Sequence, residues 1–187
     1  WKKHESGPMS EHIWAPELHY LDGRWYLYFA GGEKEDIWKI RPYVLECEGQ
    51  DPISDNWVEK GMMQAAEDDE FSFHAFSLDM TIFENKGKRY CVWAEKVSVG
   101  KQISNLYIAQ MESPVKLKTA QVLLTTPDYD WERYGFWVNE GPAVIHHDGK
   151  IFLTFSASDT GINYCVGLLT VDEDADLLDP GNWKKER

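Results

Sequence analysis

The sequence predicts an all-β fold of the β-propeller type, built from repeated four-stranded sheets called blades. A hairpin signal, in which two strand-like runs flank a tight turn, occurs three times, with its turn glycine at Gly23, Gly87 and Gly149. These glycines lie 64 and 62 residues apart, which is too long for a helical solenoid and suits four strands with their connections. A further strand-like run that begins with tyrosine follows each hairpin, at positions 43, 107 and 164.

The repeats place successive blades at residues 12–60, 75–124 and 138–185. The first begins with Trp-Ala-Pro-Glu at 14–17, where proline favours extended backbone over helix. The first and third hairpins turn on Asp-Gly, a pair that accepts the positive φ of a type I′ turn. The aromatic connections at 61–77 and 126–137 precede the second and third blades, so we expect them to border one cleft.

The two ends of the chain look alike. Trp1-Lys2-Lys3 repeats the pattern of Trp183-Lys184-Lys185, so we expect residues 1–5 to form the outer strand of a preceding blade. The chain is then part of a larger ring. Its open sheet edges would be covered by the missing blades of the same propeller or by association through those edges.

Composition narrows the class of partner. Hydrophobic residues make up 43% of the 187 residues and aromatic residues 14%, which is typical of a folded core rather than a disordered chain. The formal net charge of −13 disfavours nucleic acid and anionic membrane surfaces, and a neutral saccharide fits. No apolar run is long enough to span a bilayer, and no signal peptide is evident. The compartment is left open, with a slight preference for the cytoplasm over secretion.

Two carboxylates stand out because each lies in a strand that opens a blade. Asp79 interrupts the apolar run Ser77-Leu-Asp-Met-Thr81, where a charged residue is unfavourable unless something binds it. Glu140 directly precedes the third hairpin. Each has a purely structural alternative, such as a backbone-bonded Asp. The motifs G-x-S-x-G, H-E-x-x-H and G-x-G-x-x-G, a P-loop and zinc-type spacing of Cys and His do not occur in the sequence.

Aromatic residues supply the candidate sugar platforms. Trp14 sits at the mouth of the first blade, either as a core tryptophan or as a face on which the C–H bonds of a sugar lie. Phe76, Trp93 and Trp137 complete the predicted substrate-binding set.

Five segments together resemble glycoside hydrolase family 43, a family of five-bladed β-propellers that cleave arabinofuranosides, arabinans and xylosides. The matching strings cover nearly the whole chain in the right order, and they are most similar to the exo-acting α-L-arabinofuranosidase branch. They are HIWAPELHYLDGRWYLYFA (12–30), SLDMTIF (77–83), VNEGPAV (138–144), KIFLTFSASDTGINYCVGLL (150–169) and DADLLDP (174–180).

The resemblance implies roles for the two carboxylates. Glu140 is implied to be the general acid that protonates the departing oxygen, and Asp79 the residue that raises the pKa of that acid and orients its proton. The family's general base, an aspartate on the first strand of its first blade, is expected outside this sequence, so these residues alone are expected to hydrolyse little. Glu17 is expected to be structural, tying inner strands together.

The function expected from the resemblance is inverting removal of terminal α-L-arabinofuranosyl residues from plant saccharides. β-Xylosidase and endo-arabinanase activities, an inactive carbohydrate-binding propeller, and a scaffold without sugar chemistry remain alternatives. No cofactor or metal is expected to take part in the chemistry, and the resemblance allows a structural ion in the complete ring.

Overall fold

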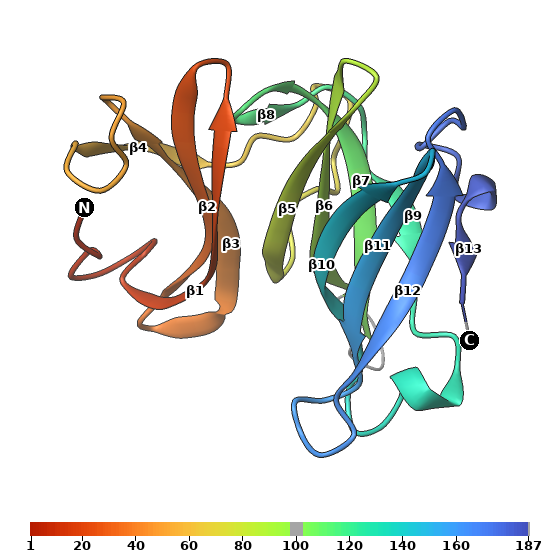
Figure 1. Ribbon diagram of the computed structural model, residues 1–187. Coiled ribbons are helices and arrows are strands. Elements are labelled where there is room, and N and C mark those ends of the chain that lie inside the picture. The colour runs from red at the N-terminus through yellow and green to blue at the C-terminus, as the bar shows by residue number, and fades with distance from the viewer. Residues whose placement is uncertain (98–102, 187) are drawn as a thin grey trace.

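A computed structural model describes residues 1–97 and 103–186 (Figure 1). Apart from two single-turn 3₁₀ helices, η1 (Asp130–Glu132) and η2 (Pro180–Asn182), the regular structure of these residues is β-strand. The predicted all-β class is therefore confirmed. The strands form successive antiparallel blades, each of which runs from an inner strand to an outer one.

Two large sheets hold these strands. The first blade comprises β1 (Glu11–Leu21), β2 (Arg24–Glu33), β3 (Asp36–Cys47) and β4 (Trp57–Met62). The second comprises β5 (Ser77–Asn85), β6 (Lys88–Val97) and β7 (Ile103–Ser113), with β8 (Lys116–Leu117) and β9 (Val122–Thr125) both paired to β7. The third comprises β10 (Trp137–His147), β11 (Lys150–Ala157), β12 (Cys165–Asp172) and β13 (Lys184–Lys185). A short parallel pairing of β7 with β10 joins the second and third blades into one sheet.

Each inner hairpin closes through a turn with two left-handed residues. The φ angles are 52° and 80° at Asp22-Gly23, 49° and 72° at Lys86-Gly87, and 48° and 73° at Asp148-Gly149. Positive φ at both central residues defines the type I′ turn, whose twist matches that of the flanking strands. The three hairpin turns read from the sequence are thus present.

Each inner strand also carries a one-residue bulge at the same height. The pairing jumps from Trp14 to Glu17 in β1, from Leu78 to Thr81 in β5, and from Glu140 to Ala143 in β10, while the partner strand advances by only two residues. In each bulge, the residue that directly follows Trp14, Leu78 or Glu140 has a positive φ. These residues are Ala15 (46°), Asp79 (54°) and Gly141 (57°). Bulges of this kind bend a strand and redirect its side chains.

The hydrophobic core lies between neighbouring blades. One cluster joins Tyr28 and Val44 of the first blade to Ile82 and Trp93 of the second. A second cluster joins residues of the second blade, such as Val92, to residues of the third, such as Ile151. Because β6 is covered on both faces, its central residues are buried without alternation. This packing fixes the angle between blades and so the relative position of their inner strands.

Polar contacts reinforce the same joints. The guanidinium of Arg89 in β6 donates to both carboxylate oxygens of Asp22 in the first hairpin turn, at 2.9 Å each. Asn85, at the end of β5, donates from Nδ2 to the carbonyl oxygen of Glu173 beyond β12, at 2.9 Å.

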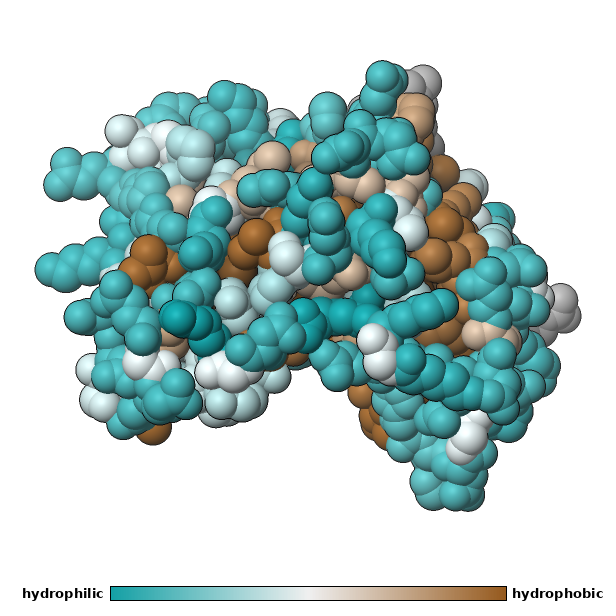
Figure 2. Space-filling model, turned by 90° about the horizontal axis from the view of Figure 1, so that it is seen from above, coloured by the Kyte–Doolittle hydropathy of each residue, from teal (hydrophilic) through white to brown (hydrophobic). Residues whose placement is uncertain are grey.

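The outer strand expected at residues 1–5 does not form, and residues 1–4 have no regular structure. The Trp1 ring instead lies 5.4 Å from that of Phe29, and its Nε1 donates to Glu59 of β4. Residues 1–5 therefore pack on the first blade of this chain. Seen from above, most of the surface is hydrophilic, with hydrophobic residues showing in smaller patches, as expected for a chain of net charge −13 (Figure 2).

Candidate active site

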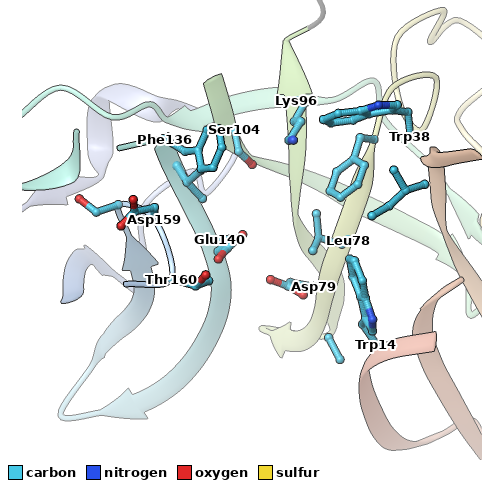
Figure 3. Close-up of a pocket in the computed structure, with 15 residues that line it drawn as sticks. Trp14, Trp38, Leu78, Asp79, Lys96, Ser104, Phe136, Glu140, Asp159 and Thr160 are labelled. Atoms are coloured by element: carbon cyan, nitrogen blue, oxygen red, sulfur yellow. The ribbon is translucent and has the colours of Figure 1, made fainter. Parts of the chain in front are cut away.

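A pocket of about 560 Å³ opens where the inner strands of the three blades meet. Its wall is largely apolar and aromatic, with three carboxylates and one ammonium group among the lining side chains (Figure 3). The lining residues are Trp14, Ala15, Ile37, Trp38, Phe76, Leu78, Asp79, Lys96, Ser104, Phe136, Val138, Glu140, Ser158, Asp159 and Thr160.

The inner-strand bulges bring Asp79 and Glu140 to this pocket. Asp79 is itself the left-handed residue of the β5 bulge, and Glu140 directly precedes the left-handed Gly141 of the β10 bulge. Figure 3 shows the two carboxylates turned toward each other from neighbouring strands. The backbone N–H of Gly141 donates to Oδ2 of Asp79 at 3.0 Å, which ties the two bulges together. Two predicted site residues 61 positions apart in the sequence thus share one pocket.

Both carboxyls favour the protonated form more than usual. Burial, followed by the negative charge of Glu140, raises the pKa of Asp79 to about 6, although the Gly141 N–H opposes the rise. Burial also raises the pKa of Glu140, against the lowering effects of a Tyr164 hydrogen bond and the Lys96 charge. Two carboxyls in one desolvated site cannot both ionise easily, so the pair retains a proton at a higher pH than either would in water.

Lys96 is a site residue that the sequence analysis missed. Its Nζ lies 4.4 Å from the ring centroids of both Trp38 and Phe76, an arrangement typical of cation–π contacts. Burial lowers the pKa of Lys96, while the negative charge of Glu140 opposes that effect. The signal in the sequence was weak, because a single lysine at the end of a strand is most often a solvated surface residue.

Tyr164 was also missed as a site residue. It was assigned to the aromatic strand of the third blade, yet its hydroxyl donates to Oε1 of Glu140 at 2.8 Å. The corresponding tyrosine of the first blade, Tyr43, is buried in a core cluster instead. The repeat therefore predicted where Tyr164 lies but not where its hydroxyl points.

Two of the four aromatic residues predicted to bind substrate line the pocket, and two do not. Trp14 and Phe76 line the pocket. Trp93 does not: its side chain is fully buried in the core between the first two blades, and its Nε1 donates to Glu95, so the prediction that it contacts substrate is wrong. Trp137 is not among the lining residues, and its ring lies 4.5 Å from the Arg133 guanidinium. Both tryptophans occur in strands where pattern alone does not distinguish a core face from a pocket face.

Glu17 does not line the pocket. It lies beyond the β1 bulge, where its carboxylate forms a hydrogen bond with the imidazole of His19 of the same strand, at 2.8 Å. The contact between inner strands that was expected of it is therefore made by Asp79 and Gly141. In the β1 bulge, Ala15 and not Glu17 occupies the position that Asp79 occupies in the β5 bulge.

Two buried glutamates hold the aromatic connections that border the pocket. Glu95 accepts hydrogen bonds from the backbone N–H groups of Phe73 and Ala75, each at 3.0 Å, beside Phe76. Glu132 accepts from the backbone N–H groups at positions 128 and 129, from Nδ2 of Asn139 and from Nζ of Lys185. Because Asn139 directly precedes Glu140, the second network also fixes the strand that carries this carboxylate.

The third carboxylate of the lining has a local structural role. Oδ1 of Asp159 accepts from the backbone N–H of Gly161 at 3.3 Å, and the Asp159 N–H donates to the carbonyl of Tyr134. Asp159 also leaves no room for a side chain at Gly135, where an added Cβ would clash with its carboxylate. Asp159 thus holds two loops together at the pocket rim.

Within residues 1–97 and 103–186, no group of three or more His, Cys, Asp or Glu side chains is arranged to hold a metal ion. Over the same residues, no helix has the length and apolar character needed to cross a membrane.

Comparison with known proteins gives consistent matches. A profile of the family described as "Glycosyl hydrolases family 43" matches residues 1–187. The "Extracellular exo-alpha-(1->5)-L-arabinofuranosidase" of Streptomyces chartreusis is 45% identical over 185 residues, which cover 99% of this chain and 55% of that protein. The protein of the same name from Streptomyces avermitilis is 44% identical over 185 residues, which cover 99% of this chain and 37% of its own length.

Among solved structures, that of α-L-arabinofuranosidase from Lactobacillus brevis matches with a TM-score of 0.89 and 48% identity. The match covers 100% of this chain and 58% of the other. The propeller fold predicted from the repeats is thereby confirmed. The chain spans roughly half the length of the proteins it matches, between 37% and 58% of the three described.

The slight preference for the cytoplasm is wrong, because both Streptomyces relatives are named extracellular. No signal peptide is evident in these 187 residues. A signal peptide is an N-terminal feature. Since the chain aligns with only part of each relative, its lack of one carries no information on compartment.

Proposed function

Because the chain belongs to glycosyl hydrolases family 43, we propose that the protein is an inverting glycosidase that removes terminal α-L-arabinofuranosyl residues from arabinose-containing saccharides. The observation that carries the proposal is the pairing of Asp79 and Glu140 in one pocket through the Gly141 N–H. Relatives named as exo-acting arabinofuranosidases support the choice of sugar.

Glu140 is proposed to be the general acid. An acid that donates a proton near neutral pH must hold that proton in the resting site, which requires a raised pKa. Burial provides this for Glu140. The proton passes to the glycosidic oxygen as the bond to the anomeric carbon breaks, and the carboxylate that remains is stabilised by the positive charge of Lys96.

Asp79 is proposed to orient Glu140 and to raise its pKa. A negative charge on Asp79 disfavours a second negative charge on Glu140, so the proton of Glu140 is retained. The bond from Gly141 to Asp79 fixes the backbone next to Glu140 and thereby the direction of its side chain. No direct contact of Asp79 with the reacting bond is needed for this role.

Inversion also needs a carboxylate that takes a proton from the attacking water, roughly 6.5 to 9.5 Å from the acid. Asp159 is engaged in loop contacts, and Glu17 lies outside the pocket wall. We therefore propose that the base comes from a part of the full-length protein beyond these 187 residues. The chemistry we propose uses no cofactor.

The aromatic wall is proposed to bind the sugar. Trp14 is 38% exposed and presents its ring to the pocket, as expected for a face that packs against sugar C–H bonds. Phe76 and Trp38 form a second apolar surface around Lys96. The Lys96 ammonium is left to donate to substrate hydroxyl oxygens between these rings.

The test uses the full-length protein with 4-nitrophenyl α-L-arabinofuranoside and with an α-1,5-linked arabino-oligosaccharide. We expect release of arabinose from both, with the inverted anomer formed first by proton NMR. Glu140→Gln should lower turnover of the oligosaccharide by roughly 10²- to 10⁴-fold. Glu48→Gln, which changes an exposed glutamate, is the matched control.

Tight binding of arabinan without turnover by the wild-type protein would instead identify a carbohydrate-binding propeller. Hydrolysis of 4-nitrophenyl β-D-xylopyranoside in preference to the arabinofuranoside would replace the proposed sugar by xylose.

A further inference from the structure

Tyr164 reaches Glu140 across an intervening strand. Glu140 of β10 pairs with Ser156 of β11, and Ser156 pairs with Val166 of β12. Tyr164 lies two residues before Val166, just outside β12, and its hydroxyl oxygen is 2.8 Å from Oε1 of Glu140. The side chain of Ser156, between the two strands, also forms a hydrogen bond with Tyr164. The phenol is therefore held at two points.

The direction of the Tyr164 hydrogen bond follows from its protonation. Burial, together with nearby carboxylates, raises the pKa of Tyr164 to about 12, so the hydroxyl keeps its proton over the pH range in which Glu140 titrates. A hydroxyl that faces a carboxylate donates to it. Oε1 of Glu140 is thus occupied by a donor whether or not the carboxyl group carries a proton.

The two oxygens of Glu140 are consequently unequal. In a protonated carboxyl group, the oxygen without the proton is the better hydrogen-bond acceptor, so a fixed donor at Oε1 favours the proton on Oε2. The backbone on the other side of the carboxyl is fixed as well, because the Gly141 N–H is bound to Asp79.

We propose that Tyr164 is a positioning residue that places the transferable proton on Oε2 of Glu140 and holds that oxygen toward the glycosidic oxygen. This inference rests on the proposed function of Glu140 as the acid. In the step, the Oε2 proton moves to the glycosidic oxygen, which also takes the electron pair of the breaking bond to the anomeric carbon. Water supplies the new oxygen, and its proton goes to the carboxylate base of the full-length protein.

Substrates that differ in leaving group separate this role from simple structural support. The 4-nitrophenolate group departs with little protonation, whereas a sugar alkoxide requires the proton of Glu140. In the full-length protein, Tyr164→Phe should lower kcat for the arabino-oligosaccharide by about 10- to 100-fold, a fraction of the whole effect of general acid catalysis. The kcat for 4-nitrophenyl α-L-arabinofuranoside should fall much less, and the KM values for both substrates should stay unchanged.

Two variants serve as controls. Tyr20→Phe removes a hydroxyl from an exposed tyrosine on β1 whose ring packs against Trp25, and should leave both substrates unaffected. Ser156→Ala removes the second bond to Tyr164 without touching its ring, and should reproduce the same selectivity in weaker form if Tyr164→Phe does not fold. Equal losses on both substrates, or none, would overturn the proposal.

A titration of the Glu140 carboxyl by carbon-13 NMR, assigned with Glu140→Gln, tests the same inference without turnover. The titratable groups that face Glu140 are Asp79 from β5, Lys96 from β6 and Tyr164. Glu17 adds a weaker effect on the pKa of Asp79. Because Tyr164 stabilises the carboxylate, Tyr164→Phe should raise the pKa of Glu140. An unchanged pKa would refute the role of Tyr164, whereas an inactive wild-type protein with the expected shift would refute only the proposed function.

Discussion

The backbone N–H of Gly141 donates a 3.0 Å hydrogen bond to Oδ2 of Asp79, a residue 62 positions earlier in the chain. Both residues have positive φ, and both occupy the same point in the bulge of an inner strand. Two neighbouring blades therefore use the same backbone irregularity for two purposes. In one, it presents a carboxylate, and in the other it presents an N–H group to that carboxylate.

Gly141→Ala should weaken this link. An L-residue at a φ of 57° costs about 1–2 kcal/mol, and the new Cβ would lie 3.4 Å from Oγ of Ser156. We expect this loss of stability in urea unfolding, together with a rise in the pKa of Asp79 as its donor moves away. Gly23→Ala is the matched control, because it has a φ of 80° with nothing within 4 Å of the new Cβ. It should lose similar stability, and an equal effect of both variants on activity would refute the special role of Gly141.

Asp79→Asn should stabilise the fold at alkaline pH. The pKa of Asp79 is about 6 in the folded protein and near 3.9 when unfolded. The stability that the protonated Asp79 carboxyl allows is therefore fully present below the unfolded pKa, and it is lost as the pH rises through 6 and the buried group ionises. The amide resembles the protonated carboxyl. The gain in free energy of unfolding should be on the order of 1–3 kcal/mol at pH 8 and close to zero at pH 4.

Thermal unfolding of the two proteins at both pH values checks this sign. Asp22→Asn provides the opposite case, since its Arg89 hydrogen bonds lower the pKa of Asp22 and so stabilise the fold above the unfolded pKa. That variant should lose stability at pH 8. A loss by Asp79→Asn at pH 8 would contradict the raised pKa.

Lys96→Met should raise the pKa of Glu140. The Lys96 charge favours the ionised carboxylate, so its removal makes deprotonation harder and moves the alkaline limb of the pH–rate profile of the full-length enzyme to higher pH. Affinity for the saccharide should fall too, because the ammonium no longer donates between Trp38 and Phe76. Lys88→Met, an exposed lysine at the other end of β6, should change neither property.

Trp14 and Trp93 should separate binding from folding. Trp93→Ala opens a cavity in a fully buried site and should cost about 3–5 kcal/mol of stability. Trp14→Ala removes a partly exposed ring from the pocket wall and should weaken oligosaccharide binding with a small change in melting temperature. Calorimetric binding and thermal unfolding of both variants provide the comparison. Unchanged binding in Trp14→Ala would remove Trp14 from the proposed sugar site.

Much of the fold and of the site could be predicted from sequence because it depends on local patterns of residues. Asp-Gly turns and the spacing of Gly23, Gly87 and Gly149 predicted the hairpins, because a type I′ turn restricts both of its central residues. Asp79 and Glu140 were recognisable because each interrupts or adjoins an apolar strand. Trp93 was misassigned because β6 is covered on both faces, so its strand lacks the alternation that would have marked an interior position.

By itself, the sequence determined the repeated all-β units, their turns, the family and the two carboxylates, since each depends on residues that are near one another in the chain. Only the tertiary structure decided that Lys96 and Tyr164 converge on Glu140, and that the Gly141 N–H meets Asp79. These contacts join residues 24 to 62 positions apart. Their geometry is set by packing between blades and by three inner-strand bulges, and no local pattern of residues encodes it.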